Sequence, residues 1–581
     1  MLKSLRPLFP YLAKYRLSLL LGGLCVLATN GVWALFPQVL GRAINDLTTG
    51  AWRHKLITYS LLIVAIAAIK GIFQFLTRWI MIGVSRDIEF DLRNDLFRHL
   101  ETLPYSYYQK TRTGDIMARV TNDLNAVRML LGPAIMYAAN TIVFTAFSLP
   151  FMFAISFRLT LWAVLPLPIV SVLLQTFGRR IHERFERIQA MFSDISARAQ
   201  ENFSGVRIIR AFSQEKSEIE LFENANREYI SRSLRLVRLM GMLFPTLETM
   251  LGLAVVFVLW LGGREVIQGK IDVGKFWAFN TYMVQLTWPI IAVGWVINLI
   301  QRGTASMARI DEILTAKPDI VDSPQAAQLA NAEVRGDLEF RHLNFAYNGT
   351  LVLHDINLCV PAGTSLAIVG PTGSGKTTLV NLIPRIYDAP GGSVLLDGRQ
   401  LDDYPLDTLR RNIGFVPQET FLFSDTVREN IAFGVEDATD AQVSAAAEGA
   451  SIAKDIESFP ERYQTMVGER GITLSGGQKQ RSAIARALIR NPKILVLDDA
   501  LSSVDTDTEE RILNHLREVM KGRTTIFISH RVSTVRAADQ IAVLHDGRIV
   551  EIGTHDDLLE KDGYYADLYN KQLLEEELET V

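Results

Sequence analysis

Residues 365–382, SLAIVGPTGSGKTTLVNL, join a β-rich run to a helix-like run through a glycine-rich loop. Glycines allow backbone N–H groups to turn inward around phosphates, Lys376 can reach β- and γ-oxygens, and the Thr377 hydroxyl suits Mg²⁺. The strand–loop–helix order argues against a chance match or a purely structural turn. The predicted nucleotide-binding residues of this loop are Gly370, Pro371, Thr372, Gly373, Ser374, Gly375, Lys376, Thr377 and Thr378.

A second apolar run, ILVLD at 494–498, follows about 120 residues later and ends in a carboxylate. An apolar strand that ends in Asp is common, but beside a phosphate loop it places Asp498 where it would hold Mg²⁺, directly or through water. Short β-rich runs such as TTIFIS at 524–529 alternate with helix-like runs in this half of the chain. That alternation is typical of an α/β domain with a largely parallel sheet.

The composition indicates a second kind of domain. The chain has 581 residues, of which 49% are hydrophobic and 21% charged, with a formal net charge of -3. This length exceeds one hydrophobic core and predicts two or three domains. A mean hydropathy of +0.16 in so charged a chain indicates an apolar membrane part and a charged soluble part. The near-neutral balance argues against a nucleic-acid-binding protein, which normally carries a strong basic excess.

The long apolar runs lie in the first half, and they are long enough to cross a hydrocarbon core of roughly 30 Å. They predict six membrane helices, at about 17–41, 56–82, 129–157, 159–178, 240–263 and 276–301. Lys70, Arg78 and Glu248 lie inside these spans, where an ionisable group indicates a functional site. Lys70 and Arg78 have two further interpretations: they lie near a membrane interface, or they pair with Glu248.

The connections between the spans alternate between short and long. Those after the second and fourth spans are rich in Arg and Lys, which places them and both termini on the cytoplasmic side. Their helical spacing predicts membrane helices that continue into the cytoplasm, with turns at 104–114 and 205–220. The predicted organisation is a membrane domain at 1–315, a linker at 316–336, an α/β nucleotide-binding domain at 337–570 and an acidic tail at 571–581.

Residues 474–478, LSGGQ, open the helix-like run KQRSAIARALI. Ser475, Gly476 and Gly477 would place a helix N-terminus where a γ-phosphate can dock; a capped helix that faces solvent is the alternative. With this motif the sequence resembles the ABC transporter family, and the six spans extend the resemblance to exporter-type half-transporters over essentially the whole chain. The resemblance implies that Ser475, Gly476, Gly477 and Gln478 contact nucleotide bound by another subunit.

The resemblance implies roles for further residues of the second half. Tyr347 resembles the aromatic that stacks on adenine, Gln418 the glutamine that touches metal and water, and Asp505 the loop residue that crosses to the partner. His530 resembles the switch histidine at the γ-phosphate, and Glu469 a residue that contacts the cytoplasmic turns. Taken singly, Tyr347 is also readable as a core aromatic, His530 as a satisfied polar residue and Glu469 as a solvated charge.

One residue departs from the family pattern. The family follows its metal-binding Asp with a Glu that polarises the attacking water, whereas this chain has Asp499. The two acids have similar pKa values, but Asp is shorter by about 1.5 Å, and misplacement by about 1 Å can cost about 100-fold in rate. We therefore expect slow hydrolysis at this chain's own site, with Asp499, His530 and Gln418 as catalytic residues and Thr377, Gln418 and Asp498 around Mg²⁺. A weakened base beside an intact LSGGQ favours a heterodimer over a slow homodimer.

The implied function is ATP-driven export of hydrophobic or amphipathic compounds by alternating access, with ATP and Mg²⁺ as cofactors. The implied partners are a second half-transporter, membrane lipid and a small-molecule substrate, and no nucleic acid. The implied location is the bacterial inner membrane, with the nucleotide-binding domain in the cytoplasm. Two alternatives stay open: a dedicated lipid, peptide or siderophore transporter, and an ATP-gated channel, which would need a continuous polar pore that these largely apolar spans do not indicate.

Overall fold

The structure of the chain is a computed structural model that describes residues 3–48, 50, 53–329, 332–468, 471, 474–500, 518, 520–529 and 532–579. It divides into two compact units. The first comprises Met1–Glu101 and Arg112–Ala316 and is helical; the second comprises Thr102–Thr111 and Lys317–Val581 and contains two β-sheets. The short segment Thr102–Thr111 therefore belongs to the second unit, although helices of the first unit flank it in the chain.

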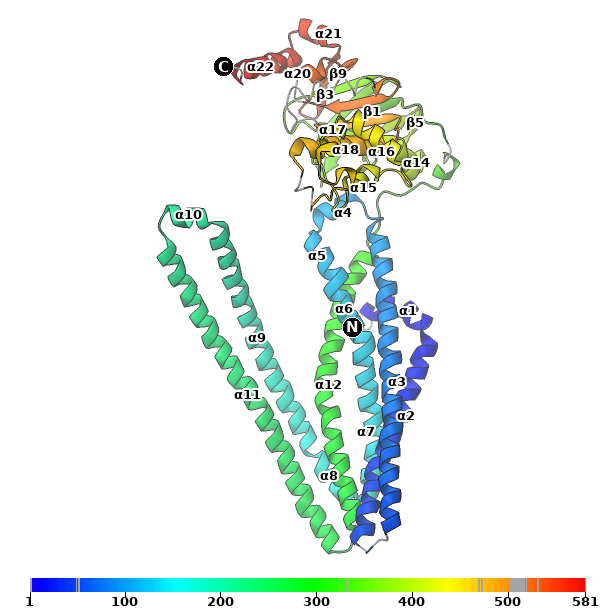
Figure 1. The fold of residues 1–581 in the computed structure, drawn as a ribbon, viewed down its shortest axis with the longest axis vertical. Helices are drawn as coiled ribbons and strands as arrows, with labels where there is room; N and C mark the ends of the chain where they lie inside the picture. Colours follow the sequence, from blue (N-terminus) through cyan, green and yellow to red (C-terminus); the bar gives the residue numbers. More distant parts are fainter. Residues whose placement is uncertain are drawn as a thin grey trace. The chain divides into compact units, whose positions relative to one another are not determined.

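Long helices form the first unit, as its apolar runs predict (Figure 1). Large apolar side chains such as Leu17 (69% exposed), Trp79 (72%) and Trp260 (64%) lie on its surface. An apolar surface of this extent is stable against lipid rather than water. The helices are α1 (Phe9–Lys14), α2 (Arg16–Thr48), α3 (Arg53–Leu100), α5 (Thr113–Ala118), α6 (Leu124–Met129), α7 (Ile135–Ile155), α8 (Phe157–Val164), α9 (Pro166–Ser204), α10 (Val206–Ala211), α11 (Glu215–Ile267) and α12 (Val273–Leu314).

The lengths of these helices match a membrane domain with cytoplasmic extensions. Five described helices are long and apolar enough to cross a membrane: Arg16–Thr48, His54–Leu100, Thr113–Ile155, Glu215–Ile267 and Val273–Leu314. With 48 residues, α3 measures about 72 Å at 1.5 Å per residue, more than twice a hydrocarbon core of roughly 30 Å. The run 159–178, predicted as one span, is divided between α8 and α9, because Pro166 has no N–H with which to continue α8.

Four helices of the first unit, α2, α3, α7 and α12, pack together (Figure 1). The backbones of α2 and α12 meet at Gly41 and Gly274, where a Cβ on Gly274 would lie 2.0 Å from the Gly41 carbonyl oxygen. Small residues permit such close approach of membrane helices. The fully buried Tyr282 of α12 donates a hydrogen bond from its hydroxyl to the Ala34 carbonyl oxygen of α2, at 2.5 Å.

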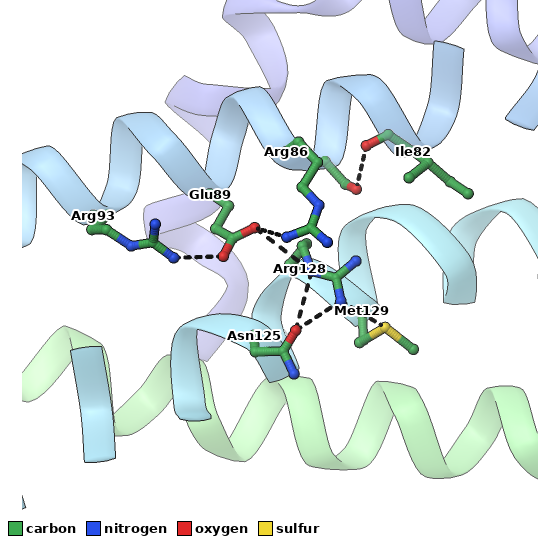
Figure 2. A network of polar contacts seen from close by, with 8 residues as sticks. Ile82, Arg86, Glu89, Arg93, Asn125, Arg128 and Met129 are labelled. Carbon is green, nitrogen blue, oxygen red and sulfur yellow. Dashed lines mark hydrogen bonds and ion pairs between the residues drawn. The ribbon is translucent and has the colours of Figure 1, made fainter. Parts of the chain in front are cut away.

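A polar network joins α3 to α6 beyond the predicted membrane spans. Figure 2 shows the Glu89 carboxylate among three arginines, Arg86 (2.9 Å), Arg93 (2.7 Å) and Arg128 (3.6 Å). Glu89 is 9% exposed and Arg128 13%, so this ion pair is shielded from water. Arg128 also donates to the Asn125 side-chain oxygen at 2.7 Å. The network therefore fixes the two helices at this level.

The second unit is built on two sheets. The four-stranded antiparallel sheet has the order β2-β1-β4-β5, and the six-stranded sheet has the order β10-β9-β3-β8-β7-β6, parallel except for β10. The strands are β1 (Leu338–Tyr347), β2 (Thr350–Val360), β3 (Ser365–Val369), β4 (Gly391–Leu396), β5 (Arg399–Gln400), β6 (Ile413–Val416), β7 (Ile494–Asp498), β8 (Thr524–Ile528), β9 (Gln540–His545) and β10 (Arg548–Gly553). This is the predicted α/β domain with a largely parallel sheet.

Helices surround the parallel sheet, whose strands β3, β7 and β8 are buried at every residue. Continuous burial is typical of parallel strands that are covered on both faces. The described helices of this unit are α4 (Tyr105–Lys110), α13 (Lys376–Asn381), α14 (Leu406–Arg411), α15 (Val427–Ala432), α16 (Asp440–Gly449), α17 (Ala453–Ser458), α18 (Gly476–Leu488), α20 (Val532–Val535), α21 (His555–Glu560) and α22 (Tyr564–Glu579).

Candidate functional site

The glycine-rich loop follows β3, which lies between β9 and β8 in the six-stranded sheet. Its glycines adopt left-handed backbone conformations, with φ of 147° at Gly370, 86° at Gly373 and 102° at Gly375. Glycine adopts such angles without steric cost. At Gly370 a Cβ would lie 2.0 Å from the Leu544 carbonyl oxygen of β9. The motif's glycines are therefore required by the path of the loop itself.

Lys376 begins α13 and is 7% exposed. Its Nζ atom donates hydrogen bonds to the carbonyl oxygens of Gly370 (2.8 Å) and Pro371 (2.9 Å). Burial lowers the pKa of Lys376, and the nearby charges of Asp498 and Asp499 act in the opposite direction. The Ser374 hydroxyl is buried and has no hydrogen-bond partner among the described residues. A cation and an unpaired hydroxyl in one loop suit phosphate oxygens.

Asp498 ends β7, which is separated from β3 by one strand, β8. This sheet order brings its carboxylate to the loop, where Thr377 Oγ1 donates to Asp498 Oδ1 at 3.2 Å. Asp498 is 1% exposed, and this burial raises its pKa to about 6. A hydroxyl and a carboxylate are oxygen ligands that suit Mg²⁺. The residues present therefore fit a magnesium ion at Thr377 and Asp498, although their role as ligands stays a prediction.

Tyr347 is the last residue of β1 and lies next to α13. Its hydroxyl is 3.5 Å from Thr378 Oγ1. Its ring packs edge-on against Phe345 and Tyr387, with centroids 4.8 and 5.4 Å apart. Tyr347 is thus both part of an aromatic cluster and next to the phosphate loop, so the two interpretations of this residue are compatible.

Asp499 and Gln418 lie at the ends of neighbouring strands. Asp499 follows β7 with a left-handed backbone (φ 48°), and its N–H donates to the Ile528 carbonyl oxygen at 3.1 Å. After burial, the charge of Asp499 is a further cause of the raised pKa of Asp498, so the two carboxylates are close. Gln418 is exposed and comes two residues after β6, the edge strand beside β7. Both residues are therefore at the carboxyl edge of the sheet, as the loop is.

The LSGGQ segment opens α18, a helix of 13 residues. Ser475 and Gln478 form a capping box, in which the Ser475 hydroxyl accepts from the Gln478 N–H and Gln478 Oε1 accepts from the Ser475 N–H. Gln478 also donates to Asp455 Oδ1 at 3.1 Å. Ser475 and Gly476 are exposed, and no described hydrogen bond joins residues 475–478 to the phosphate loop. The motif is thus a capped helix start on the surface of this unit.

Three residues with predicted roles lie outside the part of the chain that the structure describes. They are Glu469, Asp505 and His530. Their roles stay predictions that rest on the sequence motifs VGERG, LSSVDT and ISHR.

Sequence reasoning missed Tyr387, which follows α13 in the run PRIYDAP. Tyr387 is 8% exposed and lies between Tyr347 and Tyr105 of α4, with ring centroids 5.4 and 6.0 Å away. It therefore connects the predicted adenine side of the site to the segment 104–114, which was expected to be a cytoplasmic turn. A single aromatic outside any motif gives no sequence signal of this kind.

Comparison with known proteins agrees with this arrangement. Residues 19–290 match the ABC transporter transmembrane region, and residues 353–502 match the ABC transporter family. A probable multidrug resistance ABC transporter ATP-binding/permease protein of Bacillus subtilis is 38% identical over 569 residues, 97% of this chain and 96% of that protein. The chain belongs to the ABC transporter family.

Further relatives place the chain among the exporters of that family. An ATP-dependent lipid A-core flippase of Syntrophus aciditrophicus is 36% identical over 95% of this chain and 92% of its own. A solved structure of a bacterial Atm1-family ABC exporter with ATP bound is similar with a TM-score of 0.77 and 31% identity, over 97% of this chain and 98% of that one. The chain is therefore a multi-pass protein of the bacterial inner membrane, an ABC exporter whose cytoplasmic ATPase domain couples ATP hydrolysis to transport.

Proposed function

We propose that this ABC exporter moves hydrophobic or amphipathic compounds and that it works as one half of a heterodimer. The observation that carries the proposal is the division of the nucleotide site within one chain. Lys376 and Thr377 of the phosphate loop lie beside Asp498 at the end of β7, whereas the LSGGQ helix start is exposed and no described hydrogen bond joins it to the loop. A complete nucleotide site then requires two chains: one supplies the phosphate loop, and the other supplies the LSGGQ helix start.

In this proposal the loop residues hold the phosphates, and Thr377 and Asp498, with Gln418, hold Mg²⁺. The ion supplies neutralisation of the phosphate charge during phosphoryl transfer to water. Lys376 exchanges its bonds to the Gly370 and Pro371 carbonyl oxygens for bonds to phosphate. Ser475 and Gly477 offer helix-terminal N–H groups to the nucleotide on the other chain. Nucleotide that binds more tightly to the closed pair of ATPase units than to the open pair shifts the equilibrium towards the closed pair.

The carboxylate that orients the attacking water is Asp499 in this proposal, with His530 beside the γ-phosphate. The carboxylate of Asp499 lies closer to the backbone than the carboxylate of a Glu would. It therefore orients the attacking water less well, and hydrolysis at this site is slow. The partner chain would supply its own Glu, and this chain's LSGGQ would complete that faster site. This asymmetry supports a heterodimer.

Movement of the ATPase unit reaches the membrane helices through the segments at 104–114 and 205–220. The first segment contains α4, which packs on the ATPase unit through Tyr105 and Tyr387. Tyr387 also contacts Tyr347. A displacement of Tyr347 on the adenine side of the site would therefore move Tyr387 and, through it, α4.

The test uses the chain co-purified with its second half and reconstituted in liposomes. ATP-driven uptake of amphipathic compounds into inside-out vesicles, with compound-stimulated ATP hydrolysis, is the expected result, and Lys376→Ala in this chain should reduce both. An ion conductance that opens when ATP binds, together with the absence of ATP-driven uptake of any compound, would contradict the proposal. That result would favour an ATP-gated channel.

A dedicated lipid transporter is the second candidate function. The similarity to a protein named as a lipid A-core flippase supports it. The two candidates differ in the range of compounds that they transport. Stimulation of ATP hydrolysis by one class of lipid and by no other compound would favour the dedicated lipid transporter.

A further inference from the structure

A cavity of about 390 Å³ lies within the first unit, between α2, α3, α7 and α12. Its walls include apolar and aromatic side chains, among them Trp33, Phe144 and Trp288. Two cationic side chains, Lys70 and Arg78 of α3, line it as well. Both cations belong to the apolar run 56–82, where ionised groups are costly and are kept for function.

The two cations are not neutralised by acidic side chains. No Asp or Glu lines the cavity in the described part of the chain. Lys70 Nζ lies 3.9 Å from the centre of the Trp33 ring, and neither Lys70 nor Arg78 forms an ion pair with a described residue. Glu248, considered above as their partner, is not in the cavity. The Trp33 ring contacts the Lys70 ammonium group on one side. The N–H donors on its other side can donate hydrogen bonds to a ligand.

Side-chain amides also line the cavity. Gln285 of α12 lines it, and the Oε1 atom of this residue is buried with no hydrogen-bond partner among the described residues. Because this oxygen is itself shielded from solvent, it faces neighbouring protein atoms rather than the open cavity. Nearby, Asn30 of α2 donates to Asn140 Oδ1 of α7 at 2.9 Å, so these two amides already have partners.

We propose that this cavity binds an amphipathic organic anion, with its acidic group between Lys70 and Arg78 and its apolar body against Trp33, Phe144 and Trp288. The inference rests on the proposed function, because it names the class of compound that the exporter carries. Two positive charges in a medium of low dielectric constant attract an anion and repel a cation. The aromatic walls and the volume suit the apolar body of a small amphipath.

The first test is a binding measurement on the full chain with its second half, in phosphatidylcholine nanodiscs without nucleotide. The probes are 11-(dansylamino)undecanoate and its cationic counterpart, 11-(dansylamino)undecyltrimethylammonium, followed by energy transfer from tryptophan. We expect the anion to bind at least about tenfold more tightly than the cation, since a charge-assisted hydrogen bond accounts for about that factor. Equal binding of the two probes by the wild-type protein would overturn the inference.

Variants of the two cations test the site itself. Lys70→Gln and Arg78→Gln should each weaken binding of the anion about tenfold, whereas Arg158→Gln, which removes an exposed charge of α8 outside the cavity, should not. The double variant Lys70→Glu, Arg78→Glu should bind the cation in place of the anion. Such a gain cannot come from misfolding. Anion binding that survives both single variants, or a double variant that still prefers the anion, would overturn the inference.

A transport measurement separates this inference from the proposed function. If the anion binds as described but ATP drives uptake of no compound into vesicles, export fails and the binding site stands. If ATP drives uptake of the cationic probe and the anion is neither bound nor carried, export stands and the inference is wrong.

Discussion

At the scale of single residues, the burial of Asp498 is the feature with the clearest chemical consequence. Its carboxyl group is 1% exposed, and burial raises its pKa to about 6 from an ordinary value of 3.8. The folded chain therefore binds this proton more tightly than the unfolded chain does. The contribution of this group to the stability of the folded chain is therefore greatest below pH 3.8. This contribution decreases as the pH rises from 3.8 to about 6, and above that pH it stays constant.

The same shift makes metal binding depend on pH. Because Mg²⁺ needs the ionised carboxylate, its affinity should fall about tenfold per pH unit below the pKa of Asp498. Titration of Mg²⁺ at fixed trinitrophenyl-ATP between pH 5 and 8 measures this. The Asp498→Asn variant should bind Mg²⁺ weakly and retain only the titration of the nucleotide itself. The same pH dependence in both proteins would contradict the assignment of this ligand.

Asp499 gives a second prediction at this scale. Asp499→Glu should raise the single-turnover rate of ATP hydrolysis at this chain's own site about 10- to 100-fold, because the longer side chain moves the carboxylate about 1.5 Å towards the water. Asp499→Asn is the matched control and should lower the rate further. The rate is measured with the partner's phosphate loop disabled by substitution of its lysine. A rate for Asp499→Glu at or below that of the wild type would show that reach is not the limit.

At the scale of elements, the network around Glu89 joins α3 to α6 (Figure 2). Glu89→Gln would leave Arg128, which is 13% exposed, without its carboxylate. We expect a loss of about 2 kcal/mol in stability, seen as a lower melting temperature of the purified protein. The control is Glu183→Gln, which removes an exposed i,i+4 pair with Arg179 and should cost at most about 0.5 kcal/mol. Equal effects of the two substitutions would contradict a structural role for the network.

The contact of α4 with the ATPase unit gives the second prediction for elements. Tyr387→Leu removes the ring between Tyr105 and Tyr347, so transported compounds should stimulate ATP hydrolysis less, while α4 keeps its sequence. Tyr387→Phe keeps the ring and should retain the stimulation. The measurement compares hydrolysis with and without compound for both variants. Full stimulation in Tyr387→Leu would show that this aromatic contact does not transmit the movement.

Elements with a strong local pattern were predictable from the sequence. The phosphate loop and the strands on either side of β8 follow from buried apolar runs that end in Gly370 and Asp498. The break at Leu165 was not predicted, because the apolar run continues through Pro166 and hydropathy alone does not register a lost hydrogen bond. The partners of Glu89 and Tyr387 were not predictable either. They depend on which helices meet in space, and neither residue lies in a motif.

At the scale of the whole molecule, one chain supplies a membrane unit with an apolar surface and an ATPase unit with a divided nucleotide site. Purified without a second half, the chain should hydrolyse ATP slowly, and addition of the second half should raise the rate. A high rate of ATP hydrolysis by this chain alone would contradict the heterodimer, although it would leave a homodimeric exporter in place.

The central claim is that one γ-phosphate is held by loops of two chains. ATP with a photoreactive group on its γ-phosphate, irradiated in native membranes during turnover, tests it most directly when Lys376→Ala has disabled this chain's own loop. The account predicts that the peptide containing Ser475 is still labelled, by nucleotide bound to the other chain, and that the label disappears when the lysine of that chain's loop is also replaced. Labelling at Ser475 that depends on this chain's own Lys376 would contradict the account.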